Sequence, residues 1–246
     1  RNYNYLIACE QTKQAIALDP WNAQELFQSA QEHGLSIKKI VNTHEHFDHV
    51  QGNLELQQLT GAEIIAHQGA NTPGQTVELK GGEKLVLGEL NLRVLHTPGH
   101  TAAHLCLLAE GDVPMLFSGD TLFNASAGNC TKGGSVDDLF NSFINELAPL
   151  PDETLLYPGH DYMHNNLAFA LSRDPDNQAA LYWQEQIMEV DPEDMPVMTL
   201  GQERQYNPFL RLNNLAIYQR LKLQFPTLAK HPYNVFKALR SLRDIW

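Results

Sequence analysis

Four side chains of metal-binding types fall within six consecutive residues of this chain: His44, His46, Asp48 and His49. In an extended segment, residues two apart point to the same side, so His44 and His46 can hold one ion together. Asp48 and His49 follow after the chain has begun to turn, which lets them face a second ion nearby. A mixed set of imidazole and carboxylate ligands suits divalent zinc, iron or manganese. A His-rich surface loop is the alternative interpretation of these four residues taken alone.

Three further residues of the same types stand alone later in the chain. His100 lies in the segment TPGHT, Asp120 in SGDT and His160 in YPGHD, and each segment follows an expected strand. The glycine beside each residue lets the backbone approach closely. Because these residues supply the ligands that the first four lack, they favour a site for two metal ions over a surface loop.

Two other kinds of active site are less consistent with the sequence. The His-Glu-x-x-His helix of the zincins is excluded, because Asp48 stands where the second His would be. Glu45 is therefore interpreted as a solvent-side neighbour and not as a general base. Two ions roughly 3.5–4 Å apart can share a water, lower its pKa and polarise a carbonyl, so no side-chain nucleophile is required. We expect Cys106 in the core, no nucleophilic role for Cys130, and a supporting role for His104.

Short apolar runs bounded by turn residues predict the strands that carry these ligands. The expected strands cover residues 3–8, 14–18, 37–42, 63–66, 84–87, 90–96, 104–108, 115–118 and 155–157. Helical spacing predicts a helix over 23–33 and another after Gly52, with Asn53 as its cap. Asp19 and Pro20 are interpreted as a turn. The pattern indicates a strand-rich sandwich with intercalated helices.

After about residue 165 the pattern becomes helical. The expected helices cover residues 166–172, 177–190, 210–223 and 233–243, with 191–205 as an ordered connector. We therefore expect an α+β protein with two domains. Residues 1–164 would form the catalytic domain, and residues 165–246 a helical substrate-binding domain.

The order His-x-His-x-Asp-His, followed by isolated His, Asp and His, resembles the metallo-β-lactamase superfamily. That resemblance implies an αββα sandwich with the metals at one edge. It also implies the ligands: His44, His46 and His100 for the first ion, Asp48, His49 and His160 for the second, and Asp120 as the bridge. The nucleophile would be a metal-bound hydroxide held by Asp48 and Asp120. Zinc is the expected metal, with iron or manganese as alternatives.

The helical C-terminal part narrows this resemblance to the glyoxalase II family of thioesterases. The segments HDY at 160–162, NLAFA at 166–170, DPDN at 174–177 and YNPFLR at 206–211 are similar to that family. The opening NYNYL is also similar, so the resemblance covers nearly the whole chain. It implies hydrolysis of an S-(2-hydroxyacyl)glutathione, such as lactoylglutathione, to the hydroxy acid and glutathione.

The same resemblance implies which side chains bind the glutathione. Arg240 and Arg243 match two basic residues near the family's C-terminus. Residues three apart share one helix face, so their guanidinium groups can clamp a carboxylate together. Tyr162 matches a family tyrosine that binds the peptide backbone of glutathione. The loop 128–134 departs from the family, because it lacks the family's tyrosine and keeps Lys132 as its one cation.

Composition limits the partners. The chain is 43% hydrophobic and 19% charged, which is typical of a globular protein, and its net charge of −12 argues against general nucleic-acid binding. No apolar run approaches the roughly 20 residues that a membrane span needs. The three scattered cysteines indicate a reducing compartment, so we expect a cytoplasmic protein. We expect a small-molecule thioester as its partner, and a monomer or a weak oligomer.

Other functions remain open from the sequence alone. A persulfide dioxygenase of related fold, with one iron, is one enzymatic rival, and a hydrolase of a different thioester is another. A metal-sequestering or interaction module that merely retains the fold is the non-enzymatic rival. The presence of all the ligands for both ions disfavours the dioxygenase and the module.

Overall fold

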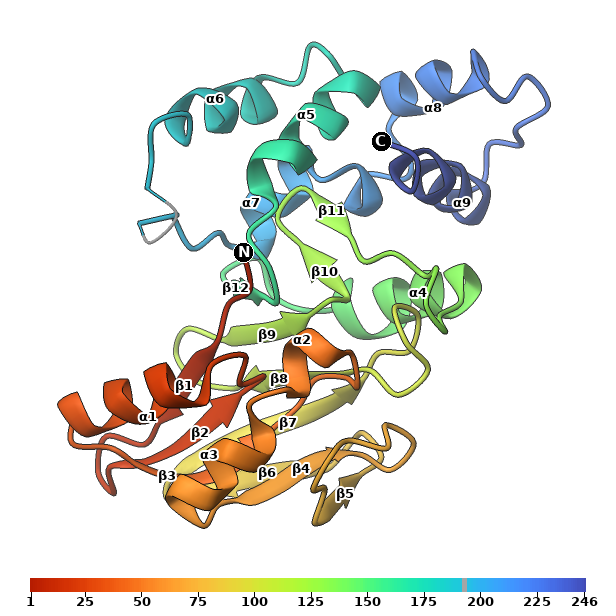
Figure 1. Cartoon of the computed structure of the whole chain (residues 1–246). Helices are drawn as coiled ribbons and strands as arrows, with labels where there is room; N and C mark the ends of the chain where they lie inside the picture. Colours follow the sequence, from red (N-terminus) through yellow and green to blue (C-terminus); the bar gives the residue numbers. More distant parts are fainter. Residues whose placement is uncertain (192–193) are drawn as a thin grey trace.

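The computed structural model describes residues 1–191 and 194–246. Two five-stranded sheets face each other in the lower half of Figure 1. The first has the order β1-β2-β3-β4-β5: β1 (Tyr5–Ala8), β2 (Gln14–Leu18), β3 (Ser36–Val41), β4 (Glu63–His67) and β5 (Val77–Leu79). The second has the order β12-β9-β8-β7-β6: β12 (Leu155–Pro158), β9 (Met115–Gly119), β8 (Leu105–Ala109), β7 (Leu90–His96) and β6 (Lys84–Leu87).

Apolar side chains fill the space between the sheets. Leu18 and Val41 of the first sheet lie in one buried cluster with Leu92, Leu107 and Phe117 of the second. Strands β2, β3, β4 and β5 run parallel, whereas β6, β7, β8 and β9 pair antiparallel. Several of these strands are buried on both faces, which explains why they appear in the sequence as continuous apolar runs.

Helices cover the two outer faces. The helices α1 (Ala23–Glu32) and α3 (Asn53–Thr60) lie on the first sheet, where Leu26 and Leu56 join Ile40 and Ile64 in a second buried cluster. The outer face of the second sheet packs against α4 (Val136–Ser142), which continues as a π-helix over Phe143–Leu147, and against C-terminal helices. The layers are therefore helix, sheet, sheet and helix, which confirms the expected αββα sandwich.

The C-terminal third is helical, as the sequence predicts. Its elements are α5 (Met163–Arg173), α6 (Gln178–Gln186), α7 (Leu200–Tyr206), the 3-10 turn Pro208–Leu210, α8 (Leu215–Lys222) and α9 (Pro232–Arg243). Phe236 and Leu239 of α9 share a buried cluster with Leu108 and Leu156 of the second sheet, so the helices complete the core of the sandwich. Among the described residues, no helix is long and apolar enough to cross a membrane.

Four expected elements differ from the structure, and one of them is the expected helix 177–190, which ends at Gln186. Asn53 is not a cap: Gly52 holds that position, and Asn53 is fully buried and exchanges amide hydrogen bonds with Asn42. The expected helix 210–223 begins only at Leu215, because Asn214 caps it by accepting from a backbone N–H. The expected connector 191–205 contains the start of α7, and its residues 192–193 lie outside the described part of the chain.

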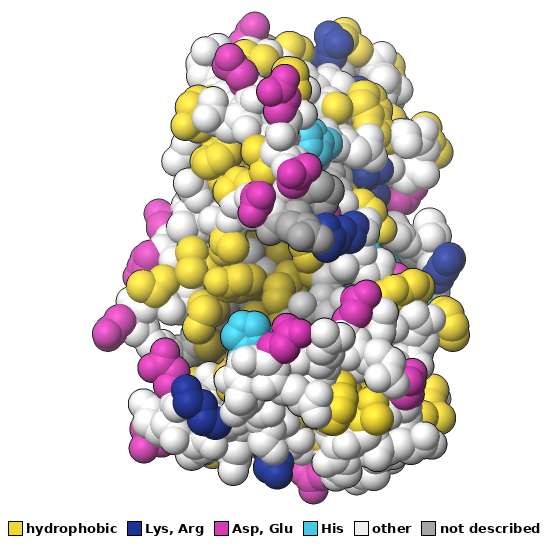
Figure 2. All heavy atoms as spheres, turned by 60° about the vertical axis from the view of Figure 1, so that its left-hand side comes forward, with side chains coloured by type: hydrophobic (Ala, Val, Ile, Leu, Met, Phe, Trp, Pro, Cys, Tyr) yellow, Lys and Arg dark blue, Asp and Glu magenta, His cyan; other side chains and the backbone are white. Residues whose placement is uncertain are grey.

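Where the two halves of the chain meet, a hydrophobic cavity lies beside β12. Its lining includes Tyr5, Tyr157, Met163 and Val197. Hydrophobic side chains gather in a hollow between the upper and lower halves on the face shown in Figure 2.

A glycine next to the short hairpin of β10 (Leu122–Phe123) and β11 (Ser126–Ala127) gives a test of this packing. A Cβ on Gly128 would overlap the backbone oxygen of Asp120. We expect Gly128→Ala to lower the free energy of unfolding by about 1–3 kcal/mol, because one of the two backbone segments must move. Urea unfolding monitored by circular dichroism measures this.

The matched control is Gly111→Ala, since a Cβ there would have no heavy atom within 4 Å. If both alanine variants unfold at the same urea concentration as the unchanged protein, the close approach at Gly128 does not constrain the fold.

Candidate metal centre

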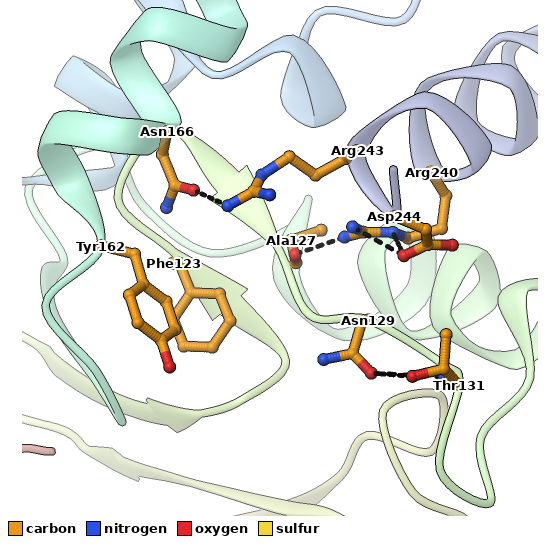
Figure 3. A pocket seen from close by; sticks show the side chains of 9 residues that line it. All are labelled: Phe123, Ala127, Asn129, Thr131, Tyr162, Asn166, Arg240, Arg243 and Asp244. Atoms are coloured by element: carbon orange, nitrogen blue, oxygen red, sulfur yellow. Dashed lines mark hydrogen bonds and ion pairs between the residues drawn. The ribbon is translucent and has the colours of Figure 1, made fainter. Parts of the chain in front are cut away.

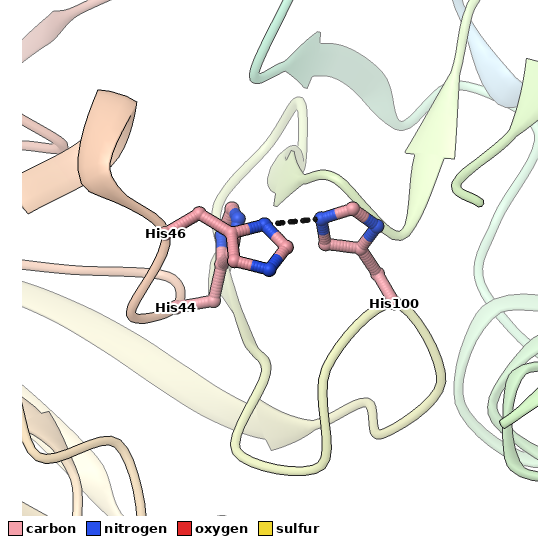
Figure 4. A group of neighbouring side chains, drawn as sticks. All are labelled: His44, His46 and His100. Atoms are coloured by element: carbon pink, nitrogen blue, oxygen red, sulfur yellow. Dashed lines mark hydrogen bonds between the residues drawn. The ribbon is translucent and has the colours of Figure 1, made fainter. Parts of the chain in front are cut away.

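The seven predicted ligands lie together where β3, β7, β9 and β12 end. The segment after β3 turns into the short helix α2 (Phe47–Val50), Asp120 directly follows β9, His160 lies two residues after the end of β12, and His100 lies four residues after the end of β7. Three sets of ligand atoms each lie within 4.8 Å of one another: His44, His46 and His100; His44, His49 and Asp120; and Asp48, His49 and His160. Figure 4 shows the first set, in which His44 and His46 face His100 across a small gap.

The unsatisfied nitrogen and oxygen atoms of this cluster fit metal ions. The Nε2 of His44 and the Oδ1 of Asp120 are buried without a hydrogen-bond partner. The His100 Nε2 lies 2.9 Å from the His46 Nδ1, and the His49 Nε2 lies 3.2 Å from the His160 Nε2. Buried polar atoms rarely stay unpaired. Imidazole nitrogens that converge in this way, together with carboxylates, form a donor set for divalent ions.

Asp120 lies between the sets. Its Oδ1 is 3.4 Å from the His49 Nε2, and its Oδ2 is 3.5 Å from the His100 Nε2 and 3.3 Å from the His160 Nε2. Burial acts to raise the pKa of Asp120, but the imidazoles of His49, His160 and His100 hold it below the usual range. An ionised carboxylate whose Oδ2 lies close to an imidazole of each predicted ligand set, and whose Oδ1 lies close to His49, is within reach of both predicted metal positions.

Asp19 supports the cluster, although the sequence predicts it only as part of a turn. Its carboxylate accepts from the backbone N–H and the hydroxyl of Thr43, both at 2.7 Å, and lies 2.9 Å from the His49 Nδ1. Burial acts to lower the pKa of His49, but Asp19, Asp120 and Asp48 together raise it to about 9. A carboxylate on Nδ1 fixes the orientation of the ring and leaves Nε2 for an ion.

Other contacts orient the remaining imidazoles. The His100 Nδ1 lies 2.7 Å from the Asn129 carbonyl oxygen, and the His104 Nε2 accepts from the Asp120 N–H at 3.0 Å. Burial lowers the pKa of His44 and His104 well below the usual value, so both rings are neutral. Neutral imidazole is the form that binds metals. His104 thus occupies the supporting position that the sequence predicts.

Neither Cys130 nor Glu45 is placed as a nucleophile or base. Burial raises the pKa of the Cys130 thiol to about 11, so little thiolate forms at neutral pH. The carboxylate of Glu45 accepts from the Thr101 hydroxyl at 3.1 Å. Cys106 is fully buried in β8, as the sequence predicts.

A pocket of about 260 Å³ adjoins the cluster. Its lining, drawn in Figure 3, consists of Phe123, Ala127, Asn129, Thr131, Tyr162, Asn166, Arg240, Arg243 and Asp244. The Tyr162 ring stacks on the ring of His160 with centroids 4.9 Å apart, so the pocket opens next to the predicted second metal site. We refer to this cavity as the α9 pocket.

The two predicted arginines differ in this pocket. Arg240 donates to the carbonyl oxygens of Ala127 and Gly128 and forms an ion pair with Asp244 at 2.9 Å. Arg243 donates to the neutral Asn166 amide at 2.8 Å, and its Nε has no partner. Within the described part of the chain, no carboxylate lies at ion-pair distance from Arg243. Arg243 therefore keeps donors without partners, and the Asp244 carboxylate of the same pocket acts on its charge from beyond ion-pair distance.

Lys132 lies outside this pocket. Its side chain is exposed and is not part of the lining, whereas its carbonyl oxygen lies 3.3 Å from the His46 Nε2. Sequence analysis predicts it as a substrate contact, and that role stays a prediction.

The contact between Asp19 and His49 predicts a change in metal affinity. We expect Asp19→Asn to weaken metal binding by about 10–100-fold, because the amide removes the charge that orients and polarises the His49 ring. Competition with a chromophoric chelator measures the affinity. Glu45→Gln is the control, with unchanged affinity expected. Equal affinities in all three proteins would show that Asp19 does not tune the site.

Comparison with known proteins agrees with this geometry. Residues 10–160 match the family described as the Metallo-beta-lactamase superfamily, and residues 161–246 match the Hydroxyacylglutathione hydrolase C-terminus. The chain is 45% identical to a hydroxyacylglutathione hydrolase of Polaromonas sp. strain JS666, over 100% of this chain and 95% of that protein.

Solved structures are similar over most of the chain. ETHE1 from Myxococcus xanthus has a TM-score of 0.69 and 26% identity, covering 99% of this chain and 94% of that one. The di-iron-bound form of TTHA1623 has a TM-score of 0.61 and 26% identity, covering 85% of this chain and 96% of that one. With the sandwich, the ligand cluster and the helical C-terminal part, these matches show that the chain belongs to the hydroxyacylglutathione hydrolase family of the metallo-β-lactamase superfamily.

Proposed function

We propose that this protein is a metal-dependent thioesterase that hydrolyses S-(2-hydroxyacyl)glutathione to the hydroxy acid and glutathione. One observation carries the proposal: the α9 pocket, in which Arg243 donates only to a neutral amide, lies beside the ligand cluster, where Tyr162 stacks on His160. A glutathione held there would place its thioester at the cluster. The family relationship supports the same substrate.

We propose that two divalent ions bind here, with zinc as the expected metal and iron or manganese as alternatives. The di-iron form of TTHA1623 supports a two-metal site. The proposed ligands are His44, His46 and His100 for one ion, Asp48, His49 and His160 for the other, and Asp120 for both. Such ions supply a hydroxide at neutral pH and polarise the carbonyl of a substrate.

The chain's own residues bind and orient the substrate in this proposal. Arg243 donates to a carboxylate of glutathione in this proposal, because its guanidinium keeps donors without partners. Burial raises the pKa of Tyr162, so its hydroxyl stays protonated and can donate to the peptide backbone of glutathione. Asp48 and Asp120, whose Oδ2 atoms lie 3.4 and 3.3 Å from the His160 Nε2, would orient the attacking oxygen, with one of the two carboxylates accepting its O–H hydrogen bond.

Steady-state hydrolysis of lactoylglutathione, on protein of measured metal content, tests the proposed function. Release of free glutathione with saturation kinetics is the expected result. Oxygen consumption with glutathione persulfide, without thioester cleavage, would favour the dioxygenase. Turnover of other thioesters but not of lactoylglutathione would support thioester hydrolysis and refute glutathione as the thiol carrier.

The position of Asp120 predicts the effect of removing it. We expect Asp120→Ala to reduce metal content at both sites, because its carboxylate lies close to imidazoles of both predicted ligand sets. Turnover should fall by more than the roughly 10–100-fold that loss of an outer partner costs. Elemental analysis and the hydrolysis assay measure both effects. A variant with full activity and one bound metal would refute the bridging role.

The free donors of Arg243 predict an effect on substrate binding. A hydrogen bond to a charged group contributes about 1.5–3 kcal/mol, so Arg243→Ala should raise KM for lactoylglutathione about ten- to hundredfold. Metal content should stay unchanged. Lys132→Ala is the control and should change KM less, because Lys132 lies outside the α9 pocket. An unchanged KM for Arg243→Ala would refute glutathione as the carrier.

We also propose a cytoplasmic location. The three cysteines are free, with Cys9 and Cys106 buried, as is typical of a reducing compartment.

A further inference from the structure

The β10–β11 hairpin forms one wall of the α9 pocket. Phe123, at the end of β10, lines the pocket, and its ring lies 5.4 Å from Tyr162 and 6.0 Å from His160 between centroids. The hairpin begins two residues after Asp120. It has only two strand pairs of its own, Leu122 with Ala127 and Phe123 with Ser126. A hairpin this short has no stable position without outside contacts.

The contacts that hold the hairpin come from a buried carboxylate on α7. Glu203 is fully buried, and four groups donate to its two oxygens. The Asn124 amide donates at 3.0 Å and the Ala125 N–H at 2.8 Å, both from the hairpin turn. The Tyr206 hydroxyl donates at 2.6 Å and the Asn207 amide at 3.0 Å, both from the helical part.

The turn that Glu203 contacts is strained. Ala125 has a φ of +58°, a left-handed conformation that residues with a Cβ seldom adopt. Such a conformation persists only where surrounding contacts impose it. The Asn207 amide adds bonds to the carbonyl oxygens of Phe123 and Ser126, at 3.2 and 3.1 Å. The hairpin therefore depends on the helical part for its conformation.

We propose that Glu203 is a positioning residue for carrier recognition: through the turn at Asn124 and Ala125, it holds Phe123 in the wall of the α9 pocket. This inference rests on the proposed function. Glu203 is not part of the ligand cluster or of the pocket lining, so it acts on the substrate through the hairpin turn, which carries Phe123 and accepts from the pocket residue Asn166 at the Asn124 carbonyl oxygen. Its loss would let the turn relax and move the wall against which the glutathione packs.

Three variants of Glu203 test separately its hydrogen-bond acceptor, its negative charge and the length of its side chain. Glu203→Met keeps the volume but removes the acceptor, so the turn loses its anchor. Glu203→Asp keeps the carboxylate but shortens its reach by one methylene. Glu203→Gln keeps a carbonyl oxygen that accepts from Ala125 and Asn207. Its new NH2 group can donate to the side-chain oxygen of Asn124 if the Asn124 amide rotates by half a turn.

We expect Glu203→Met to raise KM for lactoylglutathione by about ten- to hundredfold, because a shift of about 1 Å in a positioning contact has effects of that size. Glu203→Asp should raise it by less, and Glu203→Gln should restore it to near the unchanged value. Calorimetric titration with glutathione should give the same order of Kd. Metal content, and hydrolysis of the lactoyl thioester of 2-mercaptoethanol, should not change.

Asn177→Ala is the matched control for a purely structural effect. Asn177 caps α6 in the same helical part and is buried, but it contacts neither the hairpin nor the pocket. It should lower Tm and leave KM unchanged. If Glu203→Met behaves in the same way, with a lower Tm and an unchanged KM, Glu203 serves folding only and the inference is wrong.

Two further outcomes are decisive. Should Glu203→Met fail to fold, Glu203→Asp decides, and an unchanged KM and glutathione Kd in that variant would refute the inference. Failure of the unchanged protein to hydrolyse lactoylglutathione would instead refute the proposed function. In that case, a wild-type Kd for glutathione in the Glu203 variants would refute the positioning role independently.

Discussion

The structure depends on one constraint: several imidazoles and carboxylates converge in a buried space at the edge of the sandwich. Atoms such as the His44 Nε2 and the Asp120 Oδ1 find no partner in the described protein. Burying unpaired polar groups costs several kcal/mol, unless a cation compensates them. The surrounding hydrogen bonds hold the predicted ligands in position despite this cost. Asp19 fixes His49, and His104 fixes the backbone of Asp120.

The helical part holds the segment after Asp120 in place. That segment must leave the ligand cluster and turn sharply, but its hairpin is too short to be stable by itself. Glu203 holds the turn, and Arg240 holds the carbonyl oxygens of Ala127 and Gly128. The next carbonyl, of Asn129, lies against the His100 Nδ1. The helices that form the α9 pocket thus also shape the backbone beside the metal ligands.

The sequence predicts those features that follow from local pattern. Strand ends and their metal-binding residues repeat a simple rule, so a strand-rich sandwich with a metal site could be predicted, and the family resemblance added the αββα arrangement and the ligands of each ion. Asp19, Asn53 and Glu203 could not, because their partners lie 24, 11 and 78 residues away along the chain. A buried carboxylate in a helix looks like any solvated glutamate until its partners are known. The start of α7 was not predicted although its signal is local, because the capping box of Thr199 and Gln202 lies in a segment interpreted as a connector.

Arg240 and Arg243 have different partners, and this difference explains how an acidic protein could bind an anionic carrier. The net charge is −12, but charges beyond about 10 Å are largely screened at ordinary ionic strength. What matters is the charge within the α9 pocket, where Asp244 forms its ion pair with Arg240, whereas Arg243 donates to the neutral Asn166 amide. In the proposed function, this arrangement leaves the Arg243 guanidinium to donate to one carboxylate of the carrier, in a pocket next to the ligand cluster.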